Sequence, residues 1–275
     1  MKQQPEQKIG TVQAVLVAEH SGIIIPVHSV LIRKQEERVS FSGDPVFSES
    51  TVTHLHTVIV PLVDGILDQL YVIKPSWTIT IHVPTAVASS NQGWQITGHS
   101  FDLPIFLFLL SAALHLPIRQ DILYTGALFS SNGEVGLVES LAEKAQAARD
   151  NSAISGFCYP NPDSDTSLKQ LKPTAYRNAI GELRACRGRI TLCETATIAD
   201  VLETTCTEQS LLTASLKAGY YGNEISTPET VIETAAHILT KEPRQRLLHV
   251  LEELVIEKQP DRIQELITCV VDYRS

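Results

Sequence analysis

The 275-residue sequence lacks an excess of positive charge, with 22 lysines and arginines against 31 aspartates and glutamates. Its formal net charge is −9. Proteins that bind nucleic acid or anionic membranes through charge carry a basic face or stripe. Neither nucleic acid nor a membrane surface is therefore expected as a main partner.

The sequence also has no long hydrophobic run, and its first residues predict no secretory leader. The longest apolar run, residues 103–114, is too short to cross a bilayer as a helix. The first eight residues, MKQQPEQK, are polar and have no apolar core of the kind that a signal peptide needs. We therefore expect a cytoplasmic protein.

Cysteine is scarce and its spacing is irregular. The five cysteines, at positions 158, 186, 193, 206 and 269, are an odd number without the spacing of a metal site. Reduced and mostly buried thiols are expected, with no metal and no cofactor. A composition of 43% hydrophobic and 19% charged residues suits one large or two small domains with a substantial core.

Predicted strands and helices alternate over the first 205 residues. Two β-branched runs, residues 9–18 and 23–32, predict a β-hairpin. Apolar residues at helical spacing over residues 48–70 predict a helix that Pro61 kinks or splits. Further strands are predicted at 38–42, 77–84, 122–129, 154–159 and 189–193, and further helices at 102–115, 137–149, 169–184 and 197–205. This order predicts an α/β (α+β) fold whose first strands are antiparallel.

The pattern changes near residue 208. Ser226-Thr227-Pro228-Glu229 is a helix start of the capping-box type, and three apolar helical faces follow it. We therefore divide the chain into residues 1–207 and a small all-helical C-terminal module, residues 208–275. The module serves either for docking or assembly, or only for extra packing against the first domain.

Two side chains in the first domain suggest a hydrolase. Ser100 stands at the start of a strongly apolar helix, and Lys144 lies on an amphipathic helix beside Leu141 and Ala145. A serine hydroxyl needs a neighbouring base to become a nucleophile, and burial can lower the pKa of a lysine enough to make it that base. Backbone amides around Ser100 could then hold an oxyanion. The plain alternatives are a helix cap at Ser100 and an exposed Lys144 that pairs with an acidic neighbour.

An ordered series of segments surrounds these two residues. His82-Val83-Pro84 precedes Gly98-His99-Ser100, residues 116–121 and Thr125-Gly126 follow, and Leu141-Ala142-Glu143-Lys144 closes the series. In this order, residues 8–207 resemble the proteolytic domain of Lon proteases. The remaining matching segments are Lys8-Ile9-Gly10-Thr11-Val12, Phe41-Ser42-Gly43, Ser48-Glu49-Ser50 and Gly133-Glu134-Val135.

The resemblance implies a Lon-type fold and a Ser–Lys dyad. It makes Ser100 the nucleophile, Lys144 the general base and Thr125 a hydroxyl that helps to hold the lysine. His82 would line the cleft, and His99 stands where the family has proline. The sequence also departs from the family where Phe101 and Asp102 replace small residues after the serine, and where Glu139-Ser140 replaces paired glycines.

No Gly-x-x-x-x-Gly-Lys-Ser/Thr phosphate loop occurs in this sequence, so we expect no ATPase motor of the Lon type. The resemblance then implies an ATP-independent serine endopeptidase that cleaves unfolded or loop segments of proteins. A separate ATPase or adaptor would be a possible partner, and Lon-type domains form homo-oligomeric rings. The alternative is a non-catalytic Lon-like scaffold acting through its helical tail. A third, weaker hypothesis, for which Phe101 is the sole support, is a hydrolase of small esters or amides.

Overall fold

The computed structural model of the chain describes residues 6–18, 21–31, 39–44, 46–69, 77–82, 95–114, 116–129, 133–164 and 166–205. The predicted helical module, residues 208–275, lies outside the described residues. The small and polar residues 85–95 also predict a surface loop; residues 85–94 lie outside the described residues, and Gln95 belongs to a short strand.

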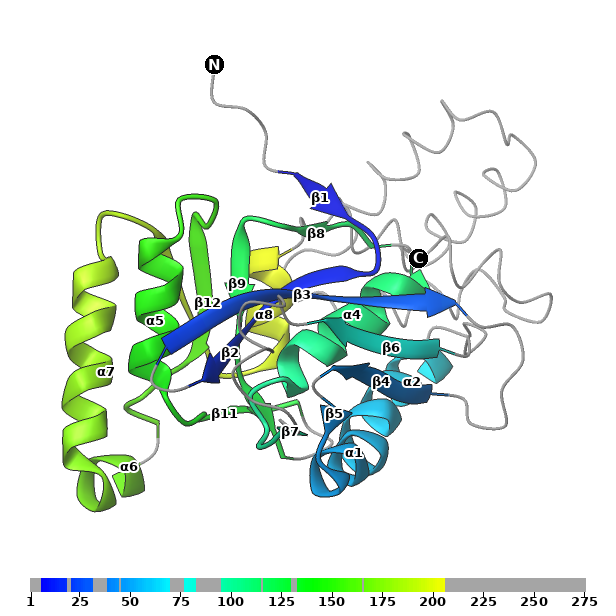
Figure 1. Cartoon of the computed structure of the whole chain (residues 1–275), viewed down its shortest axis with the longest axis horizontal. Coiled ribbons are helices and arrows are strands. Elements are labelled where there is room, and N and C mark those ends of the chain that lie inside the picture. Colours follow the sequence, from blue (N-terminus) through cyan, green and yellow to red (C-terminus); the bar gives the residue numbers. More distant parts are fainter. Residues whose placement is uncertain are drawn as a thin grey trace, which may run out of the picture.

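A seven-stranded mixed sheet forms the centre of the fold (Figure 1), in the order β13-β12-β9-β2-β3-β6-β4. The predicted hairpin is confirmed, because β2 and β3 pair in antiparallel fashion. Strand β3 also pairs antiparallel with β6, whereas β2, β9, β12 and β13 run parallel to one another. The fold is therefore mixed α/β of the general α+β kind, as the sequence predicts. The strand bounds are β2 (Thr11–Ala18), β3 (Ser21–Leu31), β4 (Val39–Asp44), β6 (Trp77–His82), β9 (Ile122–Tyr124), β12 (Gly156–Pro160) and β13 (Thr191–Thr195).

Short strand pairs extend this framework. The pairs are β1 (Gln7–Lys8) with β8 (Ile118–Arg119), β5 (Val46–Phe47) with β7 (Gln95–Ile96), and β10 (Ala127–Leu128) with β11 (Val135–Gly136). The single strand predicted over residues 122–129 is therefore wrong, because the chain leaves the sheet at Thr125-Gly126 and begins β10 after it. This break is where the chain meets the segment that carries Ser100.

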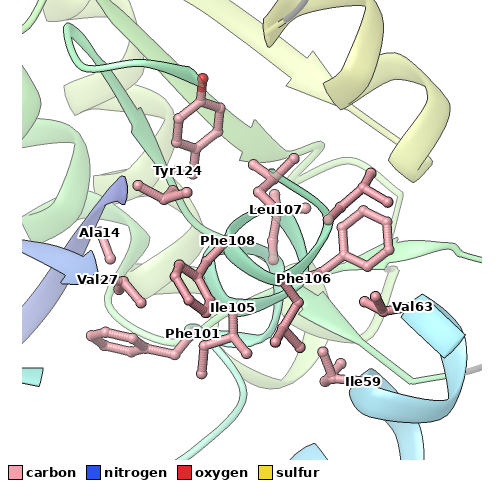
Figure 2. Close-up of a cluster of buried hydrophobic side chains, with 14 of the residues drawn as sticks. Ala14, Val27, Ile59, Val63, Phe101, Ile105, Phe106, Leu107, Phe108 and Tyr124 are labelled. Carbon is pink, nitrogen blue, oxygen red and sulfur yellow. The ribbon is translucent and has the colours of Figure 1, made fainter. Parts of the chain in front are cut away.

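Helix α4 (Asp102–Leu114) is the core helix of one layer. All but one of its residues are buried, as expected for a helix that is apolar all round. Figure 2 shows its side chains between the sheet and a helical segment. Phe101, Ile105, Phe106, Leu107 and Phe108 lie among Ala14, Val27 and Tyr124 of the sheet and Ile59 and Val63 of the helical segment.

That helical segment runs through α1 (Glu49–His54), a π-helical turn (Leu55–Ile59) and α2 (Val60–Gln69). The π-helical turn ends two residues before Pro61, whose missing N–H and bulky ring disturb a regular α-helix. The predicted disturbance at Pro61 thus takes the form of a π turn and not of a break. Residues Glu49–Leu67 are long and apolar enough to cross a membrane, with a mean hydropathy of 1.2. Leu55, Ile59 and Leu67 are nevertheless buried in the core, and a core helix passes the same test of length and composition.

The other face of the sheet is covered by α5 (Leu141–Asp150) and α7 (Pro173–Cys186), which lie side by side in Figure 1. Residues of α5 and α7 pack with Leu123 of β9 in a core cluster separate from the one around α4. The next residue, Tyr124, belongs to the α4 cluster, because successive side chains of a strand point to opposite faces. Helices α4 and α5 therefore lie on opposite faces of one sheet. The remaining helices are α6 (Thr166–Leu171) and α8 (Ile198–Thr205).

Candidate active site

Ser100 lies in a tight turn immediately before α4. Gly98 has a φ of +79°, a conformation that glycine adopts readily, and it turns the chain toward the helix. The carbonyl oxygen of Ser100 accepts hydrogen bonds from Thr125 Oγ1 at 3.3 Å and from the Gly126 amide at 3.5 Å. The break between β9 and β10 therefore holds the serine turn in place.

Gly126 makes this contact possible because it has no side chain. A Cβ atom here would lie 2.6 Å from Val135 Cγ1 and 3.3 Å from Leu103 Cδ2. In return, the Leu103 amide donates to the Gly126 carbonyl at 3.2 Å. The Thr125-Gly126 pair thus fixes the first turn of α4 as well as Ser100.

Backbone amides that could hold an oxyanion lie at the start of α4. The Asp102 amide donates to the His99 carbonyl at 3.1 Å, and the Leu103 amide donates to the Gly126 carbonyl. Within the described part of the chain, the amides of Ser100 and Phe101 make no hydrogen bond. These two amides are therefore the candidate donors for a negatively charged oxygen formed at Ser100.

Lys144 lies in the second turn of α5 and is almost completely buried, with 3% of its surface exposed. Burial lowers the pKa of its ammonium group from 10.5 to about 7, although the nearby Glu139 and Glu143 carboxylates raise it in part. Among the described residues, no hydrogen-bond acceptor or ion-pair partner contacts Nζ. Near neutral pH, a large fraction of this lysine is thus uncharged and able to accept a proton.

The backbone just before α5 is strained. Ser140, the N-cap residue, has a φ of +56°, and it is the single non-glycine residue with positive φ in the ranges described. Its carbonyl accepts a hydrogen bond from the Lys144 amide at 3.2 Å. A left-handed serine costs about 1–2 kcal/mol of folding free energy. The contacts around the start of α5 must therefore offset this cost.

The two residues of the predicted dyad belong to elements on opposite faces of the sheet, since Ser100 directly precedes α4 and Lys144 lies on α5. Thr125, directly after β9, bonds to Ser100, while α5 packs through Leu141 and Ala145 in the cluster that contains Leu123. No hydrogen bond joins Ser100 Oγ to Lys144 Nζ in the described structure. The Thr125 hydroxyl, to which the resemblance gives the role of holding the lysine, donates instead to the serine carbonyl.

The other predicted residues lie on two different elements. His82 ends β6, where its backbone stands opposite Asp44 of β4, and its role in lining a cleft stays a prediction. His99 directly precedes Ser100 and belongs to a cluster with His54 of α1 and Asp102 of α4. The ring centroids of the two histidines are 4.0 Å apart.

Asp102 is the buried centre of this cluster, with none of its surface exposed. Its Oδ2 atom lies 2.9 Å from His54 Nε2 and accepts the Leu128 amide at 3.0 Å. Burial raises the pKa of Asp102 to about 8, even though the Leu128 amide lowers it. Burial and the proximity of His99 lower the pKa of His54.

Sequence reasoning missed this cluster. An aspartate at a helix start ordinarily caps that helix, but the Asp102 carboxylate accepts the Leu128 amide of β10 and pairs with His54 instead. His54 lies 48 positions earlier, at the end of another helix, so no spacing links the two residues. Only the tertiary fold, which places the end of α1 beside the start of α4, brings them together.

A cavity of about 570 Å³ opens between the start of α5 and α7. Ser140, Leu141 and Glu143 line it on one side, and Leu171 and Asn178 lie on the other. Neither Ser100 nor Lys144 lines this cavity, which therefore adjoins the start of the lysine's helix and not the dyad itself.

Comparison with models of known protein families gives no match for this chain, and neither does comparison with curated protein sequences.

Proposed function

We propose that this chain is an ATP-independent, Lon-like serine endopeptidase in which Ser100 is the nucleophile and Lys144 the general base. The observation that carries the proposal is the burial of Lys144, whose pKa falls to about 7 without a hydrogen-bonded acid among the described residues. A buried, unpaired lysine destabilises the folded chain, whereas an uncharged lysine near neutral pH is what a serine nucleophile needs.

The chemistry is acyl transfer in two halves. Uncharged Lys144 takes the proton of the Ser100 hydroxyl as Oγ forms a bond to the peptide carbonyl carbon, and the Ser100 and Phe101 amides hold the resulting oxyanion. The carbon–nitrogen bond then breaks, and the lysine gives its proton to the departing amine. Water, deprotonated by Lys144, releases the new carboxylic acid and restores the serine.

Two backbone features support the Lon-like architecture that we propose for residues 1–207. Ser140 adopts a left-handed conformation at a position where the family carries glycine. Gly126 follows Thr125, as in the family, at a site where a Cβ atom would displace the Val135 side chain. The same proposal includes a homo-oligomer and a cytoplasmic location, with unfolded or loop segments of proteins as substrates, supplied directly or by a separate ATPase or adaptor.

The test is digestion of reduced casein without nucleotide, with fragments identified by mass spectrometry. Wild type, Ser100→Ala and Lys144→Met are compared with the matched controls Ser164→Ala and Lys169→Met, whose side chains are more exposed. We expect cleavage in wild type and both controls and its loss in both dyad variants. Equal cleavage in all five chains would contradict the assignment.

A second candidate function is a non-catalytic, Lon-like scaffold that acts through the helical tail. The missing hydrogen bond between Ser100 and Lys144 and the buried Asp102 carboxyl two residues from the serine favour it. This hypothesis predicts no cleavage by any chain. It also predicts that Ser100→Ala preserves the biological function, whereas deletion of residues 208–275 abolishes it.

A further inference from the structure

The cluster of His54, His99 and Asp102 has no role in the acyl-transfer chemistry proposed above. It lies where α1, the turn before α4 and the end of β10 meet. One ligand-type atom from each of the three side chains lies within 4.8 Å of the other two. Such convergence from two distant segments is a feature of the tertiary fold and not of local sequence.

The three ligand atoms lie close enough for a single bound cation, but His54 Nε2 also lies 3.1 Å from the Leu128 carbonyl oxygen and would give up that contact to bind an ion. Asp102 Oδ2 lies 2.9 Å from His54 Nε2 and 3.7 Å from His99 Nδ1. Two ligand atoms on one tetrahedral zinc ion, each about 2.0–2.1 Å from it, lie about 3.3 Å apart. Movements of a few tenths of an ångström would therefore bring these atoms onto one ion.

Two buried atoms in the cluster are left without partners in the described structure. They are His99 Nδ1 and Asp102 Oδ1, and neither has a hydrogen bond. Asp102 is completely buried, and a buried polar atom without a partner costs about 1–3 kcal/mol. A cation would give His99 Nδ1 a partner, and it would satisfy Asp102 Oδ1 as well if the carboxylate bound through both of its oxygens.

The surroundings hold the would-be ligands in place. The Leu128 amide donates to Asp102 Oδ2 at 3.0 Å, which is the kind of outer hydrogen bond that orients a metal-binding carboxylate. The Phe129 ring packs near both imidazoles, with centroid distances of 6.4 Å to His54 and 5.4 Å to His99. The His99 side chain is 39% exposed as a whole, whereas its Nδ1 atom is buried on the side that faces Asp102.

We propose that His54 Nε2, His99 Nδ1 and the Asp102 carboxylate bind one divalent transition-metal ion of the zinc class. Two imidazoles and one carboxylate are ligands that zinc, cobalt and related ions prefer over magnesium or calcium. The ion would tie α1 to the turn that carries Ser100, since His99 is the residue before the serine. The site does not depend on the proposed peptidase activity.

The experiment measures metal binding directly on the full, tag-free chain after treatment with a chelator. Cobalt(II) is titrated as a spectroscopic probe and then displaced with zinc, and calorimetry gives the stoichiometry. We expect one ion per chain and a visible cobalt spectrum of a nitrogen- and oxygen-ligated site. His99→Ala and Asp102→Asn should each weaken binding by at least about 10-fold, as loss of even an outer partner does.

The matched control is His56→Ala, which removes a neighbouring histidine outside the cluster. It should bind cobalt as wild type does, and circular dichroism of each variant checks that it is folded. Absence of binding by wild type, or unchanged binding by folded His99→Ala, would overturn the proposal. So would a sulfur-to-cobalt charge-transfer band, because the ion would then sit on cysteines.

Discussion

Replacement of Lys144 by methionine separates a catalytic lysine from a structural one. Methionine keeps much of the length of the side chain but removes the charge that burial opposes. The pKa of Lys144 falls from 10.5 to about 7. One pKa unit corresponds to about 1.4 kcal/mol, so the protonated lysine destabilises the folded chain by about 5 kcal/mol.

The sign of this effect sets its dependence on pH. Below a pH of about 7 the lysine is protonated in both the folded and the unfolded chain, and the folded chain bears the full penalty. As the pH rises toward the ordinary lysine pKa of 10.5, the folded chain holds a neutral lysine while the unfolded one is still charged, and the penalty shrinks. Lys144→Met should therefore exceed wild type in unfolding free energy by about 5 kcal/mol near pH 6 and by about 2 kcal/mol near pH 9.

Urea denaturation at the two pH values measures both differences, with peptidase activity assayed on the same samples. We expect the variant to be more stable and inactive, the combination typical of a residue kept for function at a cost in stability. Lys169→Met, at a partly exposed site, should show no such dependence on pH. A difference in unfolding free energy that is the same at both pH values would refute the argument.

Three further predictions concern the same site. The value of kcat/KM for wild type should rise with pH through about 7 and then level off, because only uncharged Lys144 accepts the serine proton; a profile flat from about pH 5 to 9 would contradict this. Ser140→Gly should raise the unfolding free energy by about 1 kcal/mol and keep activity, since it relieves a positive φ of 56°; a loss of stability in urea melts would show that the serine side chain matters more. Gly22→Ala should lower stability by about 1–3 kcal/mol and reduce activity, because its Cβ would meet Glu143 O at 2.7 Å and push α5. Gly181→Ala, with open space around it, is the control and should be neutral or stabilising.

Local sequence patterns predict much of the fold where one periodicity dominates. The β-branched runs of β2 and β3 and the apolar run of α4 have the predicted type, with bounds that differ by a few residues. The break at Thr125-Gly126 could not be predicted, because it is fixed by the Ser100 carbonyl and by Leu103, residues more than twenty positions away. Long-range contacts of this kind leave no periodic signal in the strand that they interrupt.

The candidate site, like the fold, could be predicted from the sequence only in part. An apolar neighbourhood on α5 is visible in the sequence around Lys144, and the structure buries that lysine. The partnership of Asp102 with His54 is not visible, since a lone aspartate at a helix start ordinarily caps the helix. Here the buried Leu128 amide donates a hydrogen bond to the Asp102 carboxylate instead.

The most direct test of the central proposal is acylation of Ser100 itself. Wild type, Ser100→Ala and Lys144→Met are mixed with an activated peptide ester, quenched in acid within seconds, and analysed by intact mass and peptide mapping. We predict an added acyl mass on wild type that maps to Ser100, and none on either variant. An adduct on another residue, or equal acylation of wild type and Lys144→Met, would contradict the assignment of Ser100 as nucleophile and Lys144 as its base.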